Sequence, residues 1–389
     1  MRAWVLALAL GGCGFSSSAA SGNDAGDDSG RDPGGTMPPD GSGGGTPDAG
    51  PPVHVCLGTL VNVCADAPRG ALNLMTGTID TSDTSASSKC LPATTTPMVD
   101  ACVIASQTIT IPGGNTVSVT GAKRLILLAD AAVTIAGTLD AASHHGGHAG
   151  PAADTGPCPT NFRNATTGGQ GGGAWGGTFG APGNNGGNAP GGGMGGGAGS
   201  LLSITTFGGG CPGGKGANNV GGNGGGSGGH GGGAVLLLAG QTITVPGVIN
   251  ASGAGGSGGD ARGGGGGGGT GGMIVLEAPA VNVTGKCFAN GGAGGEGSSL
   301  LVNGGDGGES TAPDAAAKGG VSLSVGGDGG AGGIATVGAK PGSDGGQIGP
   351  PVNDVGGGGA AGGGVGIIKI LSTGPKPPND PMKVSPAPS

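Results

Sequence analysis

The stretch Ala234–Gly256, AVLLLAGQTITVPGVINASGAGG, contains the pattern that decides the fold. Two apolar runs, Val235–Leu238 and Ile243–Val245, precede a glycine, Gly247, a short apolar segment and then glycine-rich chain. Apolar runs rich in β-branched residues are typical of strands, and glycine marks the turns between them. The stretch therefore predicts consecutive strands that lead into a glycine-rich excursion.

The same frame recurs without gaps on both sides of this stretch, and a truncated fourth copy begins at Ile367. The equivalent positions are Leu238, Ile243, Val245, Gly247, Ile249 and Ala251; upstream Leu128, Val133, Ile135, Gly137, Leu139 and Ala141; and downstream Leu276, Val281, Val283, Gly285, Cys287 and Ala289. The spacing within a copy is too short for helices between parallel strands. We therefore expect an all-β fold, a parallel β-solenoid resembling a β-helix over residues 104–373. Within it, the continuous apolar run Leu125–Leu128 predicts a strand covered on both faces.

Glycine dominates the composition, with 106 of 389 residues, whereas aromatic residues make up 2%. Glycine buries no side chain and loses the most backbone entropy on folding, so such a chain cannot build an ordinary core. Three long glycine-rich insertions, 143–233, 253–272 and 291–364, each begin just after the frame alanine, so all should leave from one edge of the stack. The insertions are either disordered or packed against one another as polyglycine II chains.

The N-terminus has the pattern of an export signal, with Arg2 before an apolar run that ends at Leu10-Gly11-Gly12-Cys13. This tetrapeptide resembles the lipobox of bacterial lipoproteins. The resemblance implies that residues 1–12 are a signal peptide and that Cys13 carries the lipid. Gly14 in the next position favours the outer membrane by the same analogy. An ordinary secretory signal is the alternative, because small residues before a cleavage site fit it as well.

Residues 13–52 are rich in Ser, Gly, Asp and Pro and predict a disordered tether, and residues 374–389 predict a frayed, proline-rich tail. Residues 53–103 contain four cysteines and predict a small cap over the first strands. In an exported protein these read as disulfides, and proximity suggests Cys56 with Cys64 and Cys90 with Cys102, although four cysteines allow three pairings.

The remaining cysteines divide into one pair and one free thiol. Cys158 and Cys211 lie near the ends of the longest insertion, each followed by proline, and we expect them to pair. With Cys13 lipidated, an odd cysteine remains. Cys287 occupies the inward frame position of Leu139 and Ile249, so we expect a buried free thiol, because free cysteine behaves as a small apolar residue.

No motif predicts catalysis or a cofactor. His144, His145 and His148 form HHGGH and are weak candidates for a metal site, because glycines surround them and no accompanying ligand pattern is evident. Residues expected to face outward, Asp140 and Phe288 among them, do not form the stacked carboxylates of a polysaccharide-cleaving β-helix. The net charge is −8, with 15 Lys and Arg in no cluster, which excludes a nucleic-acid partner.

The lipobox, the tether and segments such as GGMIVLEAP (271–279) and FANGGAGG (288–295) resemble those of uncharacterised glycine-rich bacterial surface lipoproteins, which are often labelled PE-PGRS-like. This chain has no N-terminal PE domain pattern. The resemblance covers about residues 100–373. It implies a low-complexity protein at the cell surface, held in the membrane by its lipid. We expect a non-enzymatic structural or adhesive protein that displays a glycine-rich face to extracellular matrix or surface polymers. A carbohydrate-binding or polysaccharide-degrading β-helix is the alternative.

Overall fold

The computed structural model describes residues 51–85, 87–350, 354–374 and 380–389. The described residues form strands and no helices, so none of them provides a helix long and apolar enough to cross a membrane. The predicted signal peptide (1–12), Cys13 and nearly all of the predicted tether lie outside the described residues.

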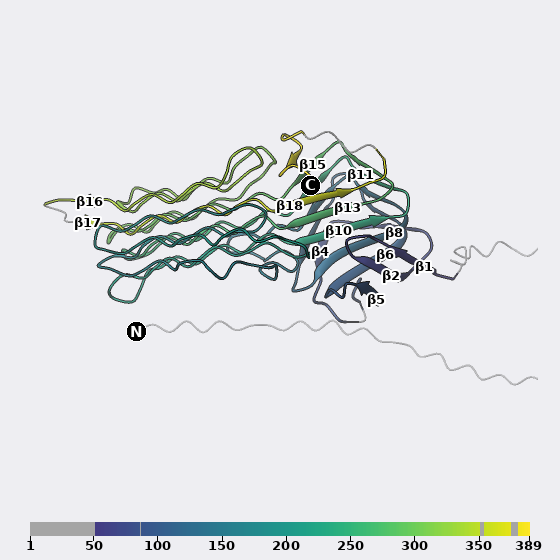
Figure 1. The fold of residues 1–389 in the computed structure, drawn as a ribbon, viewed down its shortest axis with the longest axis horizontal. Coiled ribbons are helices and arrows are strands. Elements are labelled where there is room, and N and C mark those ends of the chain that lie inside the picture. Colours follow the sequence, from purple (N-terminus) through teal and green to yellow (C-terminus); the bar gives the residue numbers. More distant parts are fainter. Residues whose placement is uncertain (1–50, 86, 351–353, 375–379) are drawn as a thin grey trace, which may run out of the picture. The chain divides into compact units, whose positions relative to one another are not determined.

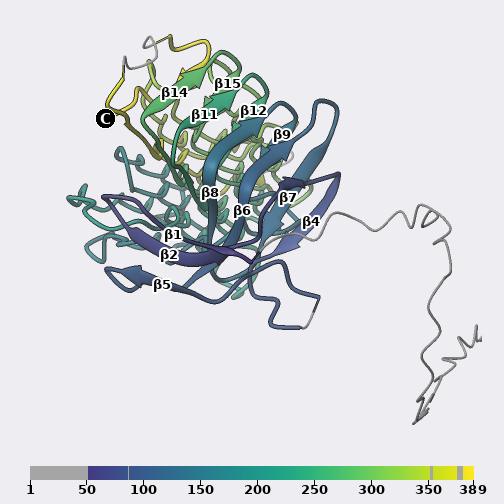
Figure 2. The ribbon, with the colours of Figure 1, turned by 90° about the vertical axis from the view of Figure 1, so that its right-hand side faces the viewer.

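Two largely parallel sheets form the base of the fold (Figures 1 and 2). The eight-stranded sheet runs β14 (Ala280–Val283), β11 (Thr242–Val245), β8 (Arg124–Ile135), β10 (Ala234–Ala239), β13 (Met273–Glu277) and β18 (Ile367–Leu371), with β6 (Ala101–Ile111) paired to β8 and β3 (Ala71–Asn73) to β6. The six-stranded sheet runs β19 (Val384–Ser385), β15 (Lys286–Phe288), β12 (Val248–Asn250), β9 (Thr138–Asp140), β7 (Thr116–Thr120) and β4 (Gly77–Asp80). Every pairing in these two sheets is parallel.

The core lies between these sheets and is built from the repeated frame. Val133, Ile243 and Val281 align on adjacent strands and are buried in it, as are Leu139 and Cys287. One register differs from the sequence frame, because Leu276 pairs with Leu237 rather than Leu238. Glu277 and Ala280 are one residue closer in sequence than their partners Leu238 and Thr242, which restores the frame from Val281 onward.

The run Leu125–Leu128 is covered on both faces, as its continuous apolar sequence predicts. Leu125 and Leu127 face the core between the sheets, whereas Ile126 and Leu128 face a second cluster beneath the cap. The cap is an antiparallel sheet of β1 (Val53–Leu57), β2 (Asn62–Ala67) and β5 (Ala93–Thr96), and it covers the outer face of the eight-stranded sheet. The segments between its strands, β3 and β4, belong to the two main sheets.

The predicted parallel β-solenoid is wrong. The described strands form separate sheets, and no strand closes a coil from the six-stranded sheet back to the eight-stranded one. Each of the three full repeats enters glycine-rich chain directly after β9, β12 or β15, where a third wall would have to begin. Glycine has no apolar side chain with which to cover a core, so the repeats make two walls and no third. The prediction of strands holds, but much of the described chain lies outside them.

The glycine-rich chain packs beside itself as a bundle that extends from one edge of the sheets (Figure 1). We call the described residues 150–233, 251–272, 289–350 and 354–366 the glycine bundle. Three of its segments, 171–177, 262–271 and 358–364, run parallel and form a closed ring of backbone hydrogen bonds. Ala174 N donates to Gly265 O (3.0 Å), Gly268 N to Ala361 O (2.9 Å) and Ala361 N to Ala174 O (3.0 Å). These bonds recur at every third residue, which is the period of a polyproline II helix.

The segment 263–272 lies at the centre of the glycine bundle, and each N–H from Gly264 to Gly272 donates to a neighbouring segment. Its hydrogen-bonded neighbours are 171–177, 211–217, 226–232, 251–257, 292–298 and 358–364. An added Cβ would collide with backbone throughout; at Gly268 it would lie 2.1 Å from Gly292 O. Polyproline II chains have no internal hydrogen bonds, so their backbone N–H and C=O groups must bond to other segments. Glycine permits the close approach that these bonds require. The insertions are therefore packed together.

The proline-rich tail is less frayed than its composition predicts. In its described part, Val384 and Ser385 form β19, which pairs with β15, and both residues are buried. Phe288, expected to face outward, is also buried, with 2% of its surface exposed. At the far end of the bundle, β16 (Gln347–Ile348) and β17 (Asp354–Val355) form a small antiparallel hairpin (Figure 1).

Candidate functional site

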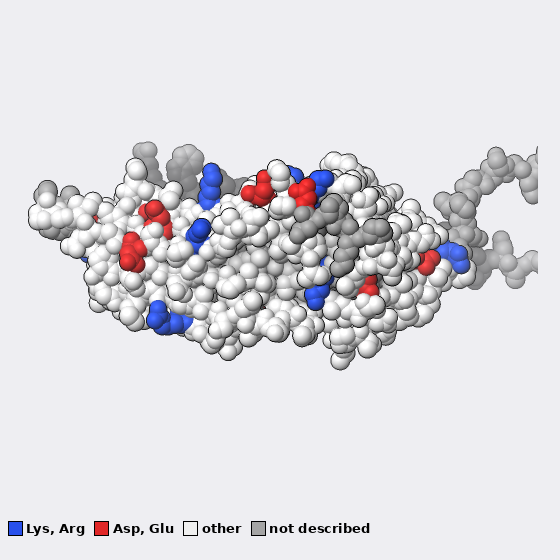
Figure 3. Space-filling view, turned by 45° about the horizontal axis from the view of Figure 1, so that its top comes forward, with Lys and Arg blue, Asp and Glu red and all other residues white. Residues whose placement is uncertain are grey.

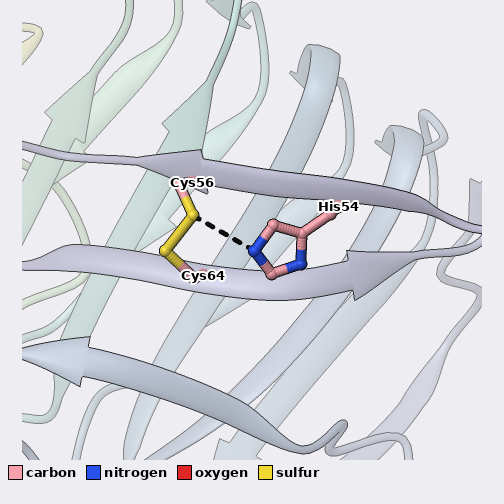
Figure 4. A group of neighbouring side chains, drawn as sticks. All are labelled: His54, Cys56 and Cys64. Carbon is pink, nitrogen blue, oxygen red and sulfur yellow. Dashed lines mark hydrogen bonds between the residues drawn. A yellow bond between two sulfur atoms is a disulfide. The ribbon is translucent and has the colours of Figure 1, made fainter.

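An exposed disulfide with a histidine beside it is the densest group of reactive side chains in the cap (Figure 4). Cys56 and Cys64 lie directly opposite each other on β1 and β2 and are bonded to each other. His54, two residues before Cys56, projects from the same face of β1, and its Nε2 lies 3.5 Å from Cys56 Sγ. Asp66, opposite His54, lies 2.9 Å from the other ring nitrogen, Nδ1.

These positions follow from strand geometry, because residues two apart on a strand share a face and cross-strand partners lie close together. His54, Cys56 and Cys64 are also the only three described His, Cys, Asp or Glu residues whose potential ligand atoms gather within 4.8 Å of one another. Thiolate is the form of cysteine that binds metals, and these sulfurs are joined to each other. The oxidised group is therefore not a metal site. The pairing of the two cysteines was predictable from their spacing, but the histidine and the aspartate were not, because only the β1–β2 register brings them beside the disulfide.

The other two disulfides are anchored in the core. They join Cys90 to Cys102 and Cys158 to Cys211, so all three pairs are the ones that proximity and position suggested. Cys102 and Cys211 are buried in the two apolar clusters, whereas neither Cys56 nor Cys64 is buried. Cys287 is free and buried, and burial raises the pKa of its thiol to about 12.

The three histidines of HHGGH do not form a metal site in the arrangement described. His144 lies between two carboxylates, with Nε2 3.2 Å from Asp140 Oδ2 and Nδ1 2.8 Å from Glu309 Oε2. Hydrogen bonds to Asp140 and Glu309 raise the pKa of His144 to about 10, so the ring carries a proton at neutral pH. A ring that donates from both nitrogens has no lone pair left for a metal.

His145 and His148 take different places from His144. The backbone N–H of His145 donates to Glu309, and its Nε2 lies 3.3 Å from Asp306 Oδ2. The exposed His148 contributes its backbone carbonyl to a bond from His144 N. The histidine turn of the first insertion is thus joined to the third insertion by the ion pair of His144 with Glu309 and by the contact of His145 with Asp306.

Two of the cavities on the described surface lie near groups already named. One, of about 520 Å³, lies between the cap and the edge of β13 and β18, where Glu277 accepts a hydrogen bond from Thr59 N (2.6 Å). The other, of about 350 Å³, lies beside the Cys158–Cys211 disulfide and is lined by Phe162 and Trp175. These two rings stack with centroids 4.4 Å apart. Polar side chains in that lining are Asn164, Thr178 and Lys215.

Turns at the far end of the glycine bundle expose aliphatic side chains. The exposed fractions are 80% for Val220, 73% for Leu301 and 98% for Leu323. The backbone of Arg262 bonds Ser299 O (3.1 Å), and Leu300 N bonds Asp354 Oδ1 (3.0 Å), so several of these turns contact one another. We call the exposed aliphatic residues of these turns the distal apolar loops; they are Val220, Leu300, Leu301, Val302, Val321, Leu323 and Ile348.

Charged side chains are few and scattered on the face shown in Figure 3, where basic and acidic residues are interspersed. An extended basic surface, which nucleic-acid binding requires, is not seen on that face. No protein-family model, no curated protein and no solved structure matches this chain.

Proposed function

We propose that this protein is a non-enzymatic display protein of the cell envelope, in which the β-sheets form a base and the glycine bundle presents its distal loops to neighbouring surfaces. Its targets are extracellular matrix or surface polymers. The lipid on Cys13 and the tether of residues 13–52 hold the base to the outer membrane, as the resemblance to the lipobox implies. The assignment to the glycine-rich surface lipoproteins belongs to this proposal.

The observation that carries the proposal is the hydrogen-bonded centre of the glycine bundle. Each N–H from Gly264 to Gly272 is bonded to another segment, and the glycines admit no side chain between the segments. A buried backbone group that lost its partner would cost about 1–3 kcal/mol, so the segments are held together rather than free to separate. A bundle of this kind can carry loops far from a base without a conventional apolar core.

The distal apolar loops supply the contact surface in this proposal. Exposed apolar surface marks interaction sites, and these side chains are exposed and lie outside the strands of the two main sheets. Contact through them needs no catalytic group, in keeping with a structural role.

A bead-retention assay tests the adhesive role. Beads coated with the protein are washed over a layer of the producing cells, and we expect Leu301→Ser with Leu323→Ser to lower retention severalfold. Met98→Ser is the matched control, because Met98 is 92% exposed but lies beside the cap strand β5. Equal retention of wild type and the double variant would overturn the adhesive role of these loops. Anchoring is tested separately by Cys13→Ser, which should move the protein from the membrane fraction to the soluble fraction.

Carbohydrate binding is the second candidate, and the cavity at Phe162 and Trp175 favours it. Aromatic rings provide a stacking surface for sugars, while Asn164 and Lys215 offer hydrogen-bond donors. The lining residues, all within the described chain, include no carboxylate, which favours binding over cleavage. Phe162→Ala should abolish any increase in melting temperature produced by a panel of surface polysaccharides. If no polysaccharide raises the melting temperature of wild type, this candidate fails.

A further inference from the structure

The disulfide Cys56–Cys64 differs from the other two in its exposure. Cys56 is exposed and Cys64 is half-buried, whereas each of the other pairs has one cysteine with at most 2% of its surface exposed. An attacking thiolate must reach a sulfur along the line of the disulfide, so access decides which bonds exchange. Both sulfurs here lie on the outer face of the β1–β2 hairpin, away from the apolar cluster that Val55, Val63 and Ala65 form beneath it.

His54 is placed to act on the sulfur that would leave. Its Nε2 lies 3.5 Å from Cys56 Sγ, and Asp66 lies 2.9 Å from Nδ1. With the Nδ1 proton donated to Asp66, a second proton on Nε2 points toward Cys56 Sγ. Histidine is the side chain that most often serves as a general acid or base, and a cation beside a cysteine favours its thiolate.

We infer that Cys56–Cys64 is a thiol-exchange site in which His54 is the catalytic acid and Asp66 positions it. A small-molecule thiolate attacks Cys64 Sγ and forms a mixed disulfide. The Sγ–Sγ bond breaks, and its electron pair goes to Cys56 Sγ, which takes the proton from His54 Nε2. A second thiolate attacks the small-molecule sulfur of the mixed disulfide and releases Cys64 as a thiolate, which is protonated by water. Two thiols are oxidised to one disulfide, and the Cys56–Cys64 pair is reduced.

The surroundings of Cys64 also suit its reduced form. Asn62 Oδ1 lies 3.6 Å from Cys64 Sγ and can accept a hydrogen bond from the Cys64 thiol once the disulfide is open. Asp66 is the one charged residue that the structure places in contact with His54 within the described chain. The side chains of His54 and Asp66 are 66% and 71% exposed, so a soluble thiol can reach the site.

Glutathione is the probe, used on the full chain. The protein is exposed to it for increasing times, free thiols are alkylated, and mass spectrometry reports each disulfide separately. We expect Cys56–Cys64 to open at least about tenfold faster than the other two pairs, because exposed disulfides are the labile ones. Equal rates for all three pairs would overturn the inference.

The role of His54 is tested by His54→Gln, with His148→Gln as the matched control because His148 is an exposed histidine far along the chain from the cap. General-acid catalysis contributes about a hundredfold or more in enclosed sites, and at this exposed one we expect His54→Gln to slow the exchange about tenfold. The rate per glutathione thiolate should fall with rising pH in wild type and be flat in His54→Gln. Asp66→Asn should slow the exchange less than His54→Gln does, because it removes only the group that orients the ring. An unchanged exchange rate and pH profile in His54→Gln would show that His54 takes no part in the mechanism. The opening rate of Cys158–Cys211 in each variant reports whether the protein is still folded.

Discussion

The centre of the glycine bundle makes a quantitative prediction about one methyl group. Gly268 lies in the closed ring of segments, and in Gly268→Ala the new Cβ would lie 2.1 Å from Gly292 O and 2.5 Å from Gly292 C. The contacting atoms are backbone and cannot rotate away, so the segment 292–298 must move. That movement strains the bond from Gly292 N to Gly269 O, which is 2.8 Å long.

The size of the effect follows from three contributions. Forcing an extra methyl into packed structure costs about 1–3 kcal/mol, and one weakened backbone hydrogen bond adds about 1 kcal/mol. Alanine lowers the entropy of the unfolded chain and returns about 0.4–1 kcal/mol. We expect Gly268→Ala to lower the free energy of unfolding by about 2 kcal/mol.

Urea unfolding followed by Trp175 fluorescence is the assay, because Trp175 lies within the glycine bundle and stacks on Phe162. Gly338→Ala is the matched control, since a Cβ there meets nothing within 4 Å. It should change the free energy of unfolding by less than about 0.5 kcal/mol. If Gly268→Ala is as stable as Gly338→Ala, glycine is not required by close packing and the account of the bundle is wrong.

Three further predictions concern single groups. Asp140 and Glu309 raise the pKa of His144 to about 10. The stability that the His144 proton contributes is therefore complete below about pH 6.5 and is lost as the pH rises toward 10. Urea unfolding at pH 6.5 and 9.5 should show this decline in wild type and not in His144→Gln. Burial raises the pKa of the Cys287 thiol to about 12, so it should resist iodoacetamide at pH 8 in the native protein and react once urea unfolds the chain. Labelling of Cys287 in the native protein would show that its site opens. Replacing Cys158 and Cys211 by alanine frees a loop with a sequence separation of 53 residues. On the chain-entropy model this should cost about 4 kcal/mol, seen as a lower urea midpoint; an unchanged midpoint would mean that the bundle alone fixes that loop.

Much of the base could be predicted from the sequence because its repeats are visible as a recurring pattern of apolar residues. Val133, Ile243 and Val281 occupy the same frame position and align on neighbouring strands. The three disulfide pairs followed from proximity and position, since cysteines close in sequence on a hairpin or at the base of a loop are the ones that meet.

The arrangement of the glycine-rich chain could not be predicted, because its specificity lies in backbone hydrogen bonds. A glycine such as Gly268 has no side chain that would indicate which segment packs against it. Its neighbours Gly177, Gly292 and Ala361 are distant in sequence. The prediction of a solenoid was wrong because an apolar repeat shows that strands stack into sheets but not whether a third sheet closes the coil. Sequence pattern also could not bring His54 and Asp66 to the disulfide, because their meeting depends on the register of β1 with β2.

The closed ring of 171–177, 262–271 and 358–364 also governs the order in which the protein can fold. Each of its members comes from a different insertion, so the ring cannot form until the last of them, near residue 364, has left the ribosome or crossed the membrane. Contacts between residues far apart in sequence slow folding, because the loops between them must close first. Segments 171–177 and 262–271 can bond to each other earlier, but groups such as Gly268 N and Ala174 O have no partner in the ring until Ala361 arrives. A nonsense codon shortly before residue 358 would leave a chain with its base strands largely present and its closed ring unable to form.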